Sequence, residues 1–172
     1  MRYRAELSGT AIIFVSRWSI DVNASVKEVV DSMRAQGENA RVKVSADYAG
    51  EPLVIDGDRF ALGRVYRNLI TNAIQATPPD GRVTVTTSRR DGFVEINVRD
   101  TGSGIPPDRL VAIFDDFVTT KRRGLGLGLA ISKRIVEQLD GTIVVTSEVG
   151  RGTSFTLRFP ASTGRAAAAV AS

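Results

Sequence analysis

Apolar and polar residues alternate with two periods along this chain, and these periods predict which segments are helices and which are strands. Between Ser25 and about Gln36, apolar side chains recur at helical spacing, at Val26, Val29, Val30 and Met33. A longer apolar stripe runs from Asp58 to about Ala76, at Leu62, Val65, Tyr66, Leu69, Ile70 and Ala73. A third helical pattern follows a glycine-rich stretch and ends near Leu139.

Two of these helices begin with capping signals. We expect Ser25 to cap the first helix, with Asn23 as the alternative, and Glu28 to complete a capping box with Ser25. Asp58 is expected to cap the second helix, which stops before the turn sequence PPDG at residues 78–81.

About six segments have the alternation or the short apolar runs of strands. They are residues 41–46, 53–55, 83–88, 93–99, 142–147 and 153–159. The sequence DG at residues 91–92 predicts a hairpin turn, and GRG at 150–152 predicts another. The chain is therefore predicted to be α+β, with helices on one face of a mixed sheet.

Composition removes several classes of function. The chain has 172 residues, of which 42% are hydrophobic and 24% charged, as expected for one globular domain. It has no histidine and no cysteine, which excludes Ser-His-Asp triads, histidine bases and disulfides. The net charge of +4 comes without interleaved aromatic and basic residues, so we expect no nucleic acid partner. No apolar run approaches the roughly 18 residues of a membrane span, so we expect a cytoplasmic domain without direct membrane contact.

The second predicted helix has an unusual polar face. Asn68, Asn72 and Gln75 are spaced i, i+4 and i+7, so three amides share one side of the helix. Asparagine inside a helix costs roughly half a kcal/mol against alanine. A solvated face is the plain interpretation, whereas neutral amide oxygens also suit a hard cation such as Mg²⁺.

A second polar motif, DTGSG at residues 100–104, follows the end of a predicted strand. Asp and Gly often make an ordinary turn at such a place. An ionised carboxylate accepts hydrogen bonds only, so Asp100 would also suit the exocyclic amino group of adenine and would repel the carbonyl of guanine.

Four motifs stand in a fixed order, namely NLITNA at 68–73, DTGSG at 100–104, FDDF at 114–117 and GLGLGL at 124–129. This order resembles the catalytic ATP-binding domain of sensor histidine kinases, with its N, G1, F and G2 boxes, over about residues 20–160. The sequence VTTK at 118–121, with Gln75 and Ala76 ending the helix, is most similar to the nitrogen-regulation and dicarboxylate-sensor subgroup. The resemblance implies a Bergerat-type ATP-binding α/β sandwich, with a mixed, mostly antiparallel sheet and three helices on one face.

The resemblance also implies roles for individual residues. Asn72 would be the principal Mg²⁺ ligand with Asn68 assisting, and Lys121 would contact the γ-phosphate, so these three would be catalytic. Asp100 would bind adenine, aided through water by Thr153. The other residues that the resemblance assigns to ATP are Gln75, Gly102, Gly104, Gly124, Leu125, Gly126, Leu127, Gly128 and Leu129. Of these, the glycines at 102 and 104 would line the base pocket, and those at 124, 126 and 128 would cradle the phosphates below a lid at residues 105–123.

The activity expected from this resemblance is transfer of the γ-phosphate to a histidine outside this chain. The partners would be the histidine-bearing dimerisation domain of the parent kinase and a downstream response regulator. The alternative is a nucleotide-sensing regulatory module without phosphotransfer. A hydrolytic ATPase of the gyrase branch is disfavoured, because Asn68 stands where that branch has a glutamate base. Asp116 departs from the subgroup, which usually has proline there.

We divide the chain into three parts. Residues 18–160 would be the catalytic ATP-binding domain, and 161–172 an alanine-rich disordered tail. Residues 1–17 would be a non-native leader or the end of a preceding dimerisation helix. The domain is expected to be monomeric, since dimerisation would reside in helices outside this chain. A parent kinase of either kind, membrane-anchored or soluble, fits these residues.

Overall fold

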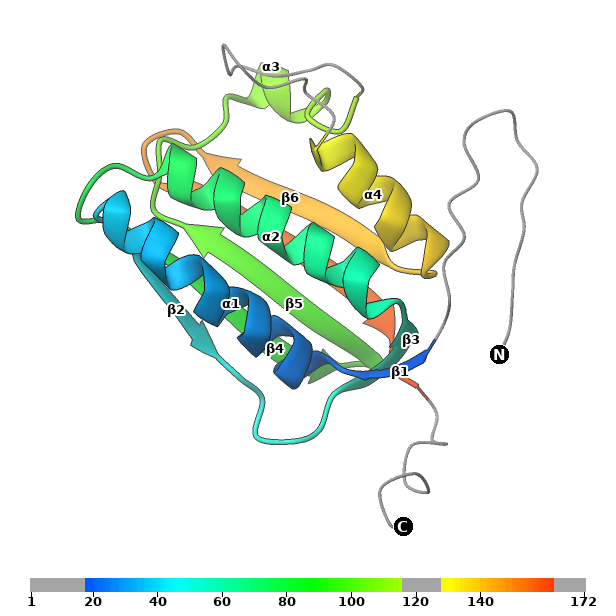
Figure 1. Cartoon of the computed structure of the whole chain (residues 1–172). Helices are drawn as coiled ribbons and strands as arrows, with labels where there is room; N and C mark the ends of the chain where they lie inside the picture. The colour runs from blue at the N-terminus through cyan, green and yellow to red at the C-terminus, as the bar shows by residue number, and fades with distance from the viewer. Residues whose placement is uncertain (1–17, 116–127, 163–172) are drawn as a thin grey trace.

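Three helices cover one face of a five-stranded sheet in the computed structural model, which describes residues 18–115 and 128–162. The helices are α1 (Val22–Asn39), α2 (Arg59–Ala76) and α4 (Gly128–Gln138), with α2 between the other two (Figure 1). A short helix, α3 (Pro107–Leu110), lies beyond the end of this layer, near the start of α4. The predicted helical layer is confirmed.

The large sheet is mixed and mostly antiparallel, as predicted. Its strand order is β2-β4-β5-β7-β6, and only the pair β2 and β4 is parallel. Its strands are β2 (Lys43–Asp47), β4 (Arg82–Arg90), β5 (Phe93–Asp100), β6 (Thr142–Glu148) and β7 (Gly152–Pro160). Buried and half-exposed residues alternate along β4 and β5, so one face packs against the helices and the other meets solvent.

A second, two-stranded sheet contains a strand that the sequence pattern missed. β1 (Trp18–Asp21) pairs antiparallel with β3 (Val54–Gly57). Among the four residues of β1 only Ile20 is buried, so the segment lacks the alternation by which a strand is predicted. The described residues therefore form seven strands where about six were predicted.

The predicted start of the first helix is wrong. The helix begins at Val22, and Asp21 caps it by accepting a hydrogen bond from the Ala24 N–H at 3.1 Å. Ser25 is buried inside the first turns, so it forms no capping box with Glu28, which instead pairs with Arg59. Pairing of β1 with β3 carries the chain up to Asp21, and an aspartate at that point is a strong cap.

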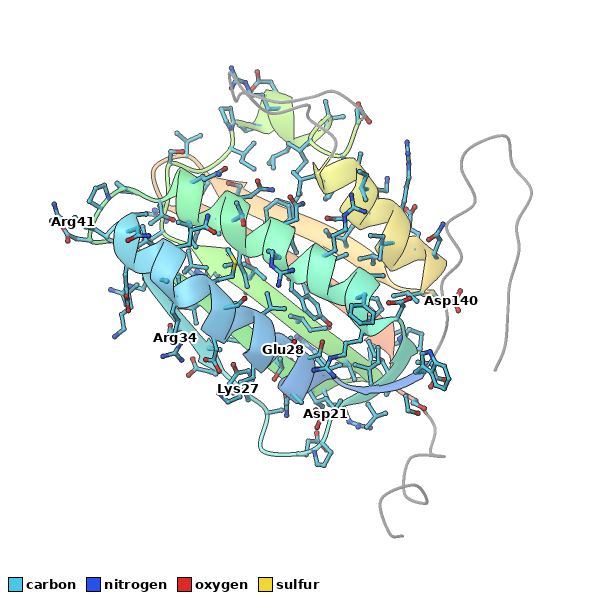
Figure 2. All side chains as sticks on the ribbon, viewed as in Figure 1. Asp21, Lys27, Glu28, Arg34, Arg41 and Asp140 are labelled. Atoms are coloured by element: carbon cyan, nitrogen blue, oxygen red, sulfur yellow. The ribbon has the colours of Figure 1, made fainter. Side chains whose placement is uncertain are left out.

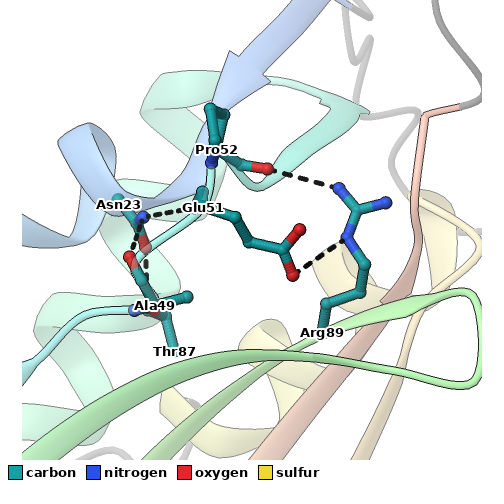
Figure 3. A network of polar contacts seen from close by, with 6 residues as sticks. All are labelled: Asn23, Ala49, Glu51, Pro52, Thr87 and Arg89. Carbon is teal, nitrogen blue, oxygen red and sulfur yellow. Dashed lines mark hydrogen bonds and ion pairs between the residues drawn. The ribbon is translucent and has the colours of Figure 1, made fainter.

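Asn23, the alternative cap, has a different task (Figure 3). Its amide donates to the carbonyls of Ala49 and Glu51, both at 3.1 Å, and accepts from the Thr87 hydroxyl at 2.6 Å. Arg89 completes the network with an ion pair to Glu51 at 3.6 Å and a bond to the Pro52 carbonyl. These contacts fix the connection between β2 and β3 against α1 and β4.

The second helix agrees closely with its prediction. The Asp58 carboxylate accepts from the N–H groups of Phe60 and Ala61, at 2.8 and 2.9 Å. All six residues of the predicted apolar stripe are buried, and Ile74 joins them. One of the six, Tyr66, carries its hydroxyl into the core, where no described residue bonds to it. Burial raises the pKa of Tyr66 well above its usual range.

This unsatisfied hydroxyl predicts that Tyr66→Phe stabilises the protein. Removing a buried polar group without a partner recovers its desolvation cost, about 1 kcal/mol or more. For a domain of this size we expect the unfolding midpoint to rise by about 3 °C, as measured by calorimetry.

Tyr48→Phe is the matched control, because Tyr48 is 37% exposed and its hydroxyl can reach water. Its midpoint should not change. A midpoint for Tyr66→Phe at or below that of the wild type would mean that the hydroxyl is satisfied in solution.

Candidate functional site

Asp100 ends β5 with its carboxylate held by the backbone. The side chain is 3% exposed, and its Oδ1 accepts from the N–H of Gly102 at 2.8 Å and of Thr153 at 3.1 Å. No described residue bonds to Oδ2, which remains an acceptor for a group from outside. Burial raises the pKa of Asp100, and the two backbone hydrogen bonds oppose that rise without cancelling it.

The loop after Asp100 lies between the end of α2 and the β6–β7 turn. The Ser103 N–H donates to the Ala76 carbonyl at 3.1 Å, and the Gly150 N–H donates to the Ser103 carbonyl at 2.8 Å. A Cβ at Gly102 would lie 2.4 Å from the Ala76 oxygen. Gly104 has a φ of +71°, and a Cβ there would lie 2.1 Å from the Glu148 oxygen. Only glycine fits at these two positions.

Ser147 is a site residue that the sequence gave no reason to select. Its hydroxyl donates to the Gly152 carbonyl at 3.0 Å and accepts from the Ile105 N–H at 2.8 Å. The Thr153 hydroxyl lies 2.9 Å from it. Since the one proton of Ser147 goes to Gly152, Thr153 is the donor in this pair and keeps its own lone pairs for a further partner. One serine on an edge strand thus positions both Thr153 and the start of the predicted lid.

The amides predicted on α2 lie along its length. Asn68 and Asn72 are half-buried, whereas Gln75, near the end of the helix, is exposed. The Asn68 Nδ2 donates to the Ser132 hydroxyl of α4 at 3.0 Å, and Ser132 donates to the Gly128 carbonyl at 2.9 Å. Asn68 therefore also fastens α2 to the start of α4.

These amides suit a hard cation by their chemistry. Among the described residues no group of three or more aspartate, glutamate, histidine or cysteine side chains could hold a metal ion. A cation on α2 would therefore depend on the amide oxygens of Asn72 and Asn68, completed by oxygens of a phosphate ligand and water, which is a set typical of Mg²⁺.

Several predicted residues lie outside the part of the chain that the structure describes. They are Asp116, Lys121, Gly124, Leu125, Gly126 and Leu127, so their roles stay predictions. The two last members of the glycine stretch are described. Gly128 begins α4 and is exposed, and Leu129 is half-buried against the core. A Cβ at Gly128 would lie 2.6 Å from the Asn68 Oδ1, so glycine permits the close contact between α4 and α2.

The described part of the predicted lid, residues 105–115, packs onto the sheet through residues near the end of this range. Ile113 is buried, and the Phe114 ring meets Phe155 of β7 edge to face with centroids 6.4 Å apart. The Lys133 ammonium lies 5.8 Å from the same ring centroid. Phe114 therefore anchors the segment that leads into the undescribed residues.

A buried carboxylate at a strand end, beside the end of a helix that carries amides, is the arrangement of an ATP-binding α/β sandwich. Residues 57–163 match the family "Histidine kinase-, DNA gyrase B-, and HSP90-like ATPase", and the chain belongs to this family. The resemblance drawn from the four motifs is thereby confirmed, while the finer subgroup stays a prediction.

Individual relatives point in the same direction. The sensor histidine kinase ZraS of Escherichia coli (strain K12) is 40% identical over 144 residues, which are 83% of this chain and 30% of that protein. Full-length ShkA in complex with AMPPNP matches with a TM-score of 0.82 and 31% identity, over 91% of this chain and 33% of ShkA. Histidine kinase ThkA in complex with the response regulator TrrA matches with a TM-score of 0.74 and 26% identity, over 86% and 42%.

The matched region thus spans less than a third of the length of ZraS and of other curated relatives that this chain matches, for example sporulation kinase A of Bacillus subtilis (strain 168). In the described ranges, no helix combines the length and the apolar character that a membrane crossing requires. Ala161 and Ser162, predicted to begin a disordered tail, bond through their N–H groups to the carbonyls of Gly92 and Val54.

The buried charge predicts that Asp100→Asn changes stability in a pH-dependent way. Asparagine retains an oxygen for the two N–H groups and carries no charge. Because the pKa of Asp100 is raised in the folded state, its ionised form lowers stability at neutral pH. We therefore expect the variant to unfold at higher denaturant than the wild type at pH 7.

This difference should shrink as the pH falls through the raised pKa toward the ordinary value of 3.8, since wild-type Asp100 then takes up its proton. Denaturant unfolding at a series of pH values measures it. A difference that grows toward acid would contradict the direction of the shift.

Proposed function

We propose that this chain is the ATP- and Mg²⁺-binding catalytic domain of a sensor histidine kinase, which donates the γ-phosphate of ATP to a histidine outside the chain. The observation that carries the proposal is the Asp100 carboxylate, buried and bound through one oxygen, with the other left to select a base. The similarity to named sensor histidine kinases supports the same conclusion.

Selection of adenine follows from the chemistry of Asp100. Its Oδ2 accepts a hydrogen bond from the exocyclic amino group, whereas guanine would place a carbonyl against it. The lone pairs left on Thr153 accept a water that bridges to the ring. Gly102 and Gly104, proposed to line the base pocket, let the loop pack closely against the carbonyls of Ala76 and Glu148.

The metal and the phosphates are placed beside α2, on the N-terminal side of its contact with the Asp100 loop. Asn72, with Asn68 assisting, holds the Mg²⁺ that neutralises phosphate charge. Lys121 contacts the γ-phosphate, and the glycines at 124, 126 and 128 approach the phosphates through their backbone, with Gln75 and the interleaved leucines completing the site.

Transfer to histidine is favoured over hydrolysis by Asn68. Its side chain is a neutral carboxamide, which is not basic enough to take a proton from water. A neutral imidazole needs no such base, because its unprotonated nitrogen carries a lone pair. That nitrogen forms a bond to the γ-phosphorus as the bond to the β,γ-bridging oxygen breaks, and ADP leaves with the electron pair.

The partners follow from the absence of histidine in this chain. The acceptor is on the dimerisation domain of the parent kinase, and a response regulator takes the phosphate afterwards. The domain acts in the cytoplasm as a monomeric unit joined to that parent, whether or not the parent is anchored in a membrane. It contacts neither nucleic acid nor lipid directly.

Nucleotide binding gives the first test. Asp100→Asn should weaken ATP binding by about tenfold or more, because the amide would present a donor where the adenine amino group needs an acceptor. Wild-type protein should bind ATP in the presence of Mg²⁺ and should not bind GTP. Titration calorimetry measures both, and Asn39→Ala, a change of an exposed amide at the end of α1, serves as control. Equal affinity for ATP in Asp100→Asn and wild type would refute the adenine site.

Phosphotransfer gives the second test. We expect labelled ATP and Mg²⁺ to phosphorylate histidine on a purified acceptor fragment of the parent kinase, with acid-labile product. Asn72→Ala should lower this rate by about a hundredfold or more, since it removes the proposed metal ligand, and Asn39→Ala should not. Tight ATP binding without any label on histidine would instead favour a nucleotide-sensing regulator. Fast release of ADP without an acceptor would favour a hydrolytic ATPase.

A further inference from the structure

A surface pocket of about 290 Å³ lies between the middle of α2 and the first turns of α4. Asn68 and Ser132, joined by their hydrogen bond, line it together with Gly128 at the start of α4. Its remaining lining residues are Arg64, Arg67, Thr71 and Ile131. None of the described residues in this lining is acidic.

The two arginines of the pocket are the feature that needs an explanation. Arg64 and Arg67 are exposed and three residues apart, so their guanidinium groups lie on one side of α2. Within the described ranges neither makes an ion pair or a side-chain hydrogen bond. Several other exposed arginines of the described chain are paired, for example Arg59 with Glu28, Arg41 with Asp80 and Arg151 with Glu148.

The pocket adjoins the proposed phosphate site, with which it shares Asn68 and Gly128, and extends from there toward the N-terminal half of α2. The Asp100 loop contacts the C-terminal end of α2 through Ala76, and Asn72 lies about one turn before that end. Along the helix axis, Asn68 precedes Asn72 by about 6 Å, and Arg64 precedes Asn72 by about 12 Å. A nucleotide with its base at Asp100 and its metal at Asn72 would point its terminal phosphate toward this pocket.

The direction of the side chains argues against a role on the nucleotide itself. Side chains of a helix lean toward its N-terminus, so Arg64 and Arg67 lean away from Asn72. With the nucleotide placed as proposed, they would border the side of the terminal phosphate opposite ADP, from which an acceptor must approach. Guanidinium groups fit carboxylates with two parallel hydrogen bonds, which gives both attraction and orientation.

We propose that this pocket is a docking site for aspartate or glutamate side chains on the polypeptide that presents the acceptor histidine. Arg64 and Arg67 bind these carboxylates and so hold the acceptor against the Asn68 and Ser132 floor. This inference rests on the proposed function, because it assigns the pocket to the partner of the phosphotransfer.

The test reverses the charge of both arginines. In the double variant Arg64→Glu/Arg67→Glu we expect the KM for a purified acceptor fragment of the parent kinase to rise about tenfold or more. The affinity of the variant for ATP should stay within about twofold of the wild-type value. Its kcat at saturating acceptor fragment should equal that of the wild type. The wild-type KM should rise with added salt, and that of the variant should respond much less.

The matched control reverses two arginines elsewhere, Arg34→Glu on α1 and Arg90→Glu at the β4–β5 hairpin, with the same change in net charge. Arg34 lies on the side of α1 turned away from α4 (Figure 2). The control should leave the KM for the acceptor fragment unchanged. Thermal unfolding checks that all variants are folded. If the charge-reversed double variant is unstable, Arg64→Gln/Arg67→Gln replaces it, with a smaller expected rise in KM.

Three outcomes overturn the proposal. An unchanged KM in the double variant means that the acceptor does not dock here. An equal rise in the control means that net charge alone is responsible. A parallel loss of ATP affinity assigns the pocket to the nucleotide phosphates.

If the wild type transfers no phosphate at all, the proposed function fails. Binding of the acceptor fragment to wild type and double variant, measured by calorimetry with a non-hydrolysable ATP analogue, then still tests the pocket.

Discussion

One carboxylate oxygen, Oδ1 of Asp100, organises the part of the site that we propose binds the base. By accepting the N–H groups of Gly102 and Thr153, it joins the end of β5 to the loop that follows it and to β7. Because Oδ1 is committed to these two donors, the direction of Oδ2 is fixed by the covalent geometry of the carboxylate. A buried charge with a raised pKa is costly for stability, and such costs are typical of binding sites. The oxygen that we propose to select the base is therefore held in place before any ligand binds.

A second constraint connects the helical layer to this site. Asn68 donates to Ser132, and Ser132 donates to the carbonyl of Gly128. A hydroxyl suits the middle position, since it can accept from one partner and donate to the other. The chain of bonds holds the first turn of α4 against α2, and the missing side chain of Gly128 allows the approach. The start of α4 is thus a fixed point for the glycine stretch that precedes it.

Sequence patterns predicted the parts of this molecule whose causes are local. The stripe on α2 and the Asp58 cap were read correctly because period and cap depend on neighbours in the chain. Asp100 and its glycines were found because a polar motif after a strand is visible in the sequence. β1 and the Asp21 cap were missed, since both depend on pairing with β3, more than thirty residues away. Ser147 and Ser132 were missed for the same reason, because a serine becomes a linking residue only through partners that the fold brings to it.

The order of the proposed tasks along α2 follows from the helix itself. Its C-terminal end meets the base loop, its middle carries the amides, and its N-terminal half carries the unpaired arginines. A helix advances about 1.5 Å per residue, so the distances among these three places are set by the sequence alone. The buried stripe fixes the rotation of α2 about its axis, and Tyr66, enclosed in the core, is part of that stripe. The same packing that stabilises the domain therefore sets which polar side chains are available for the proposed nucleotide site and which for the proposed docking site.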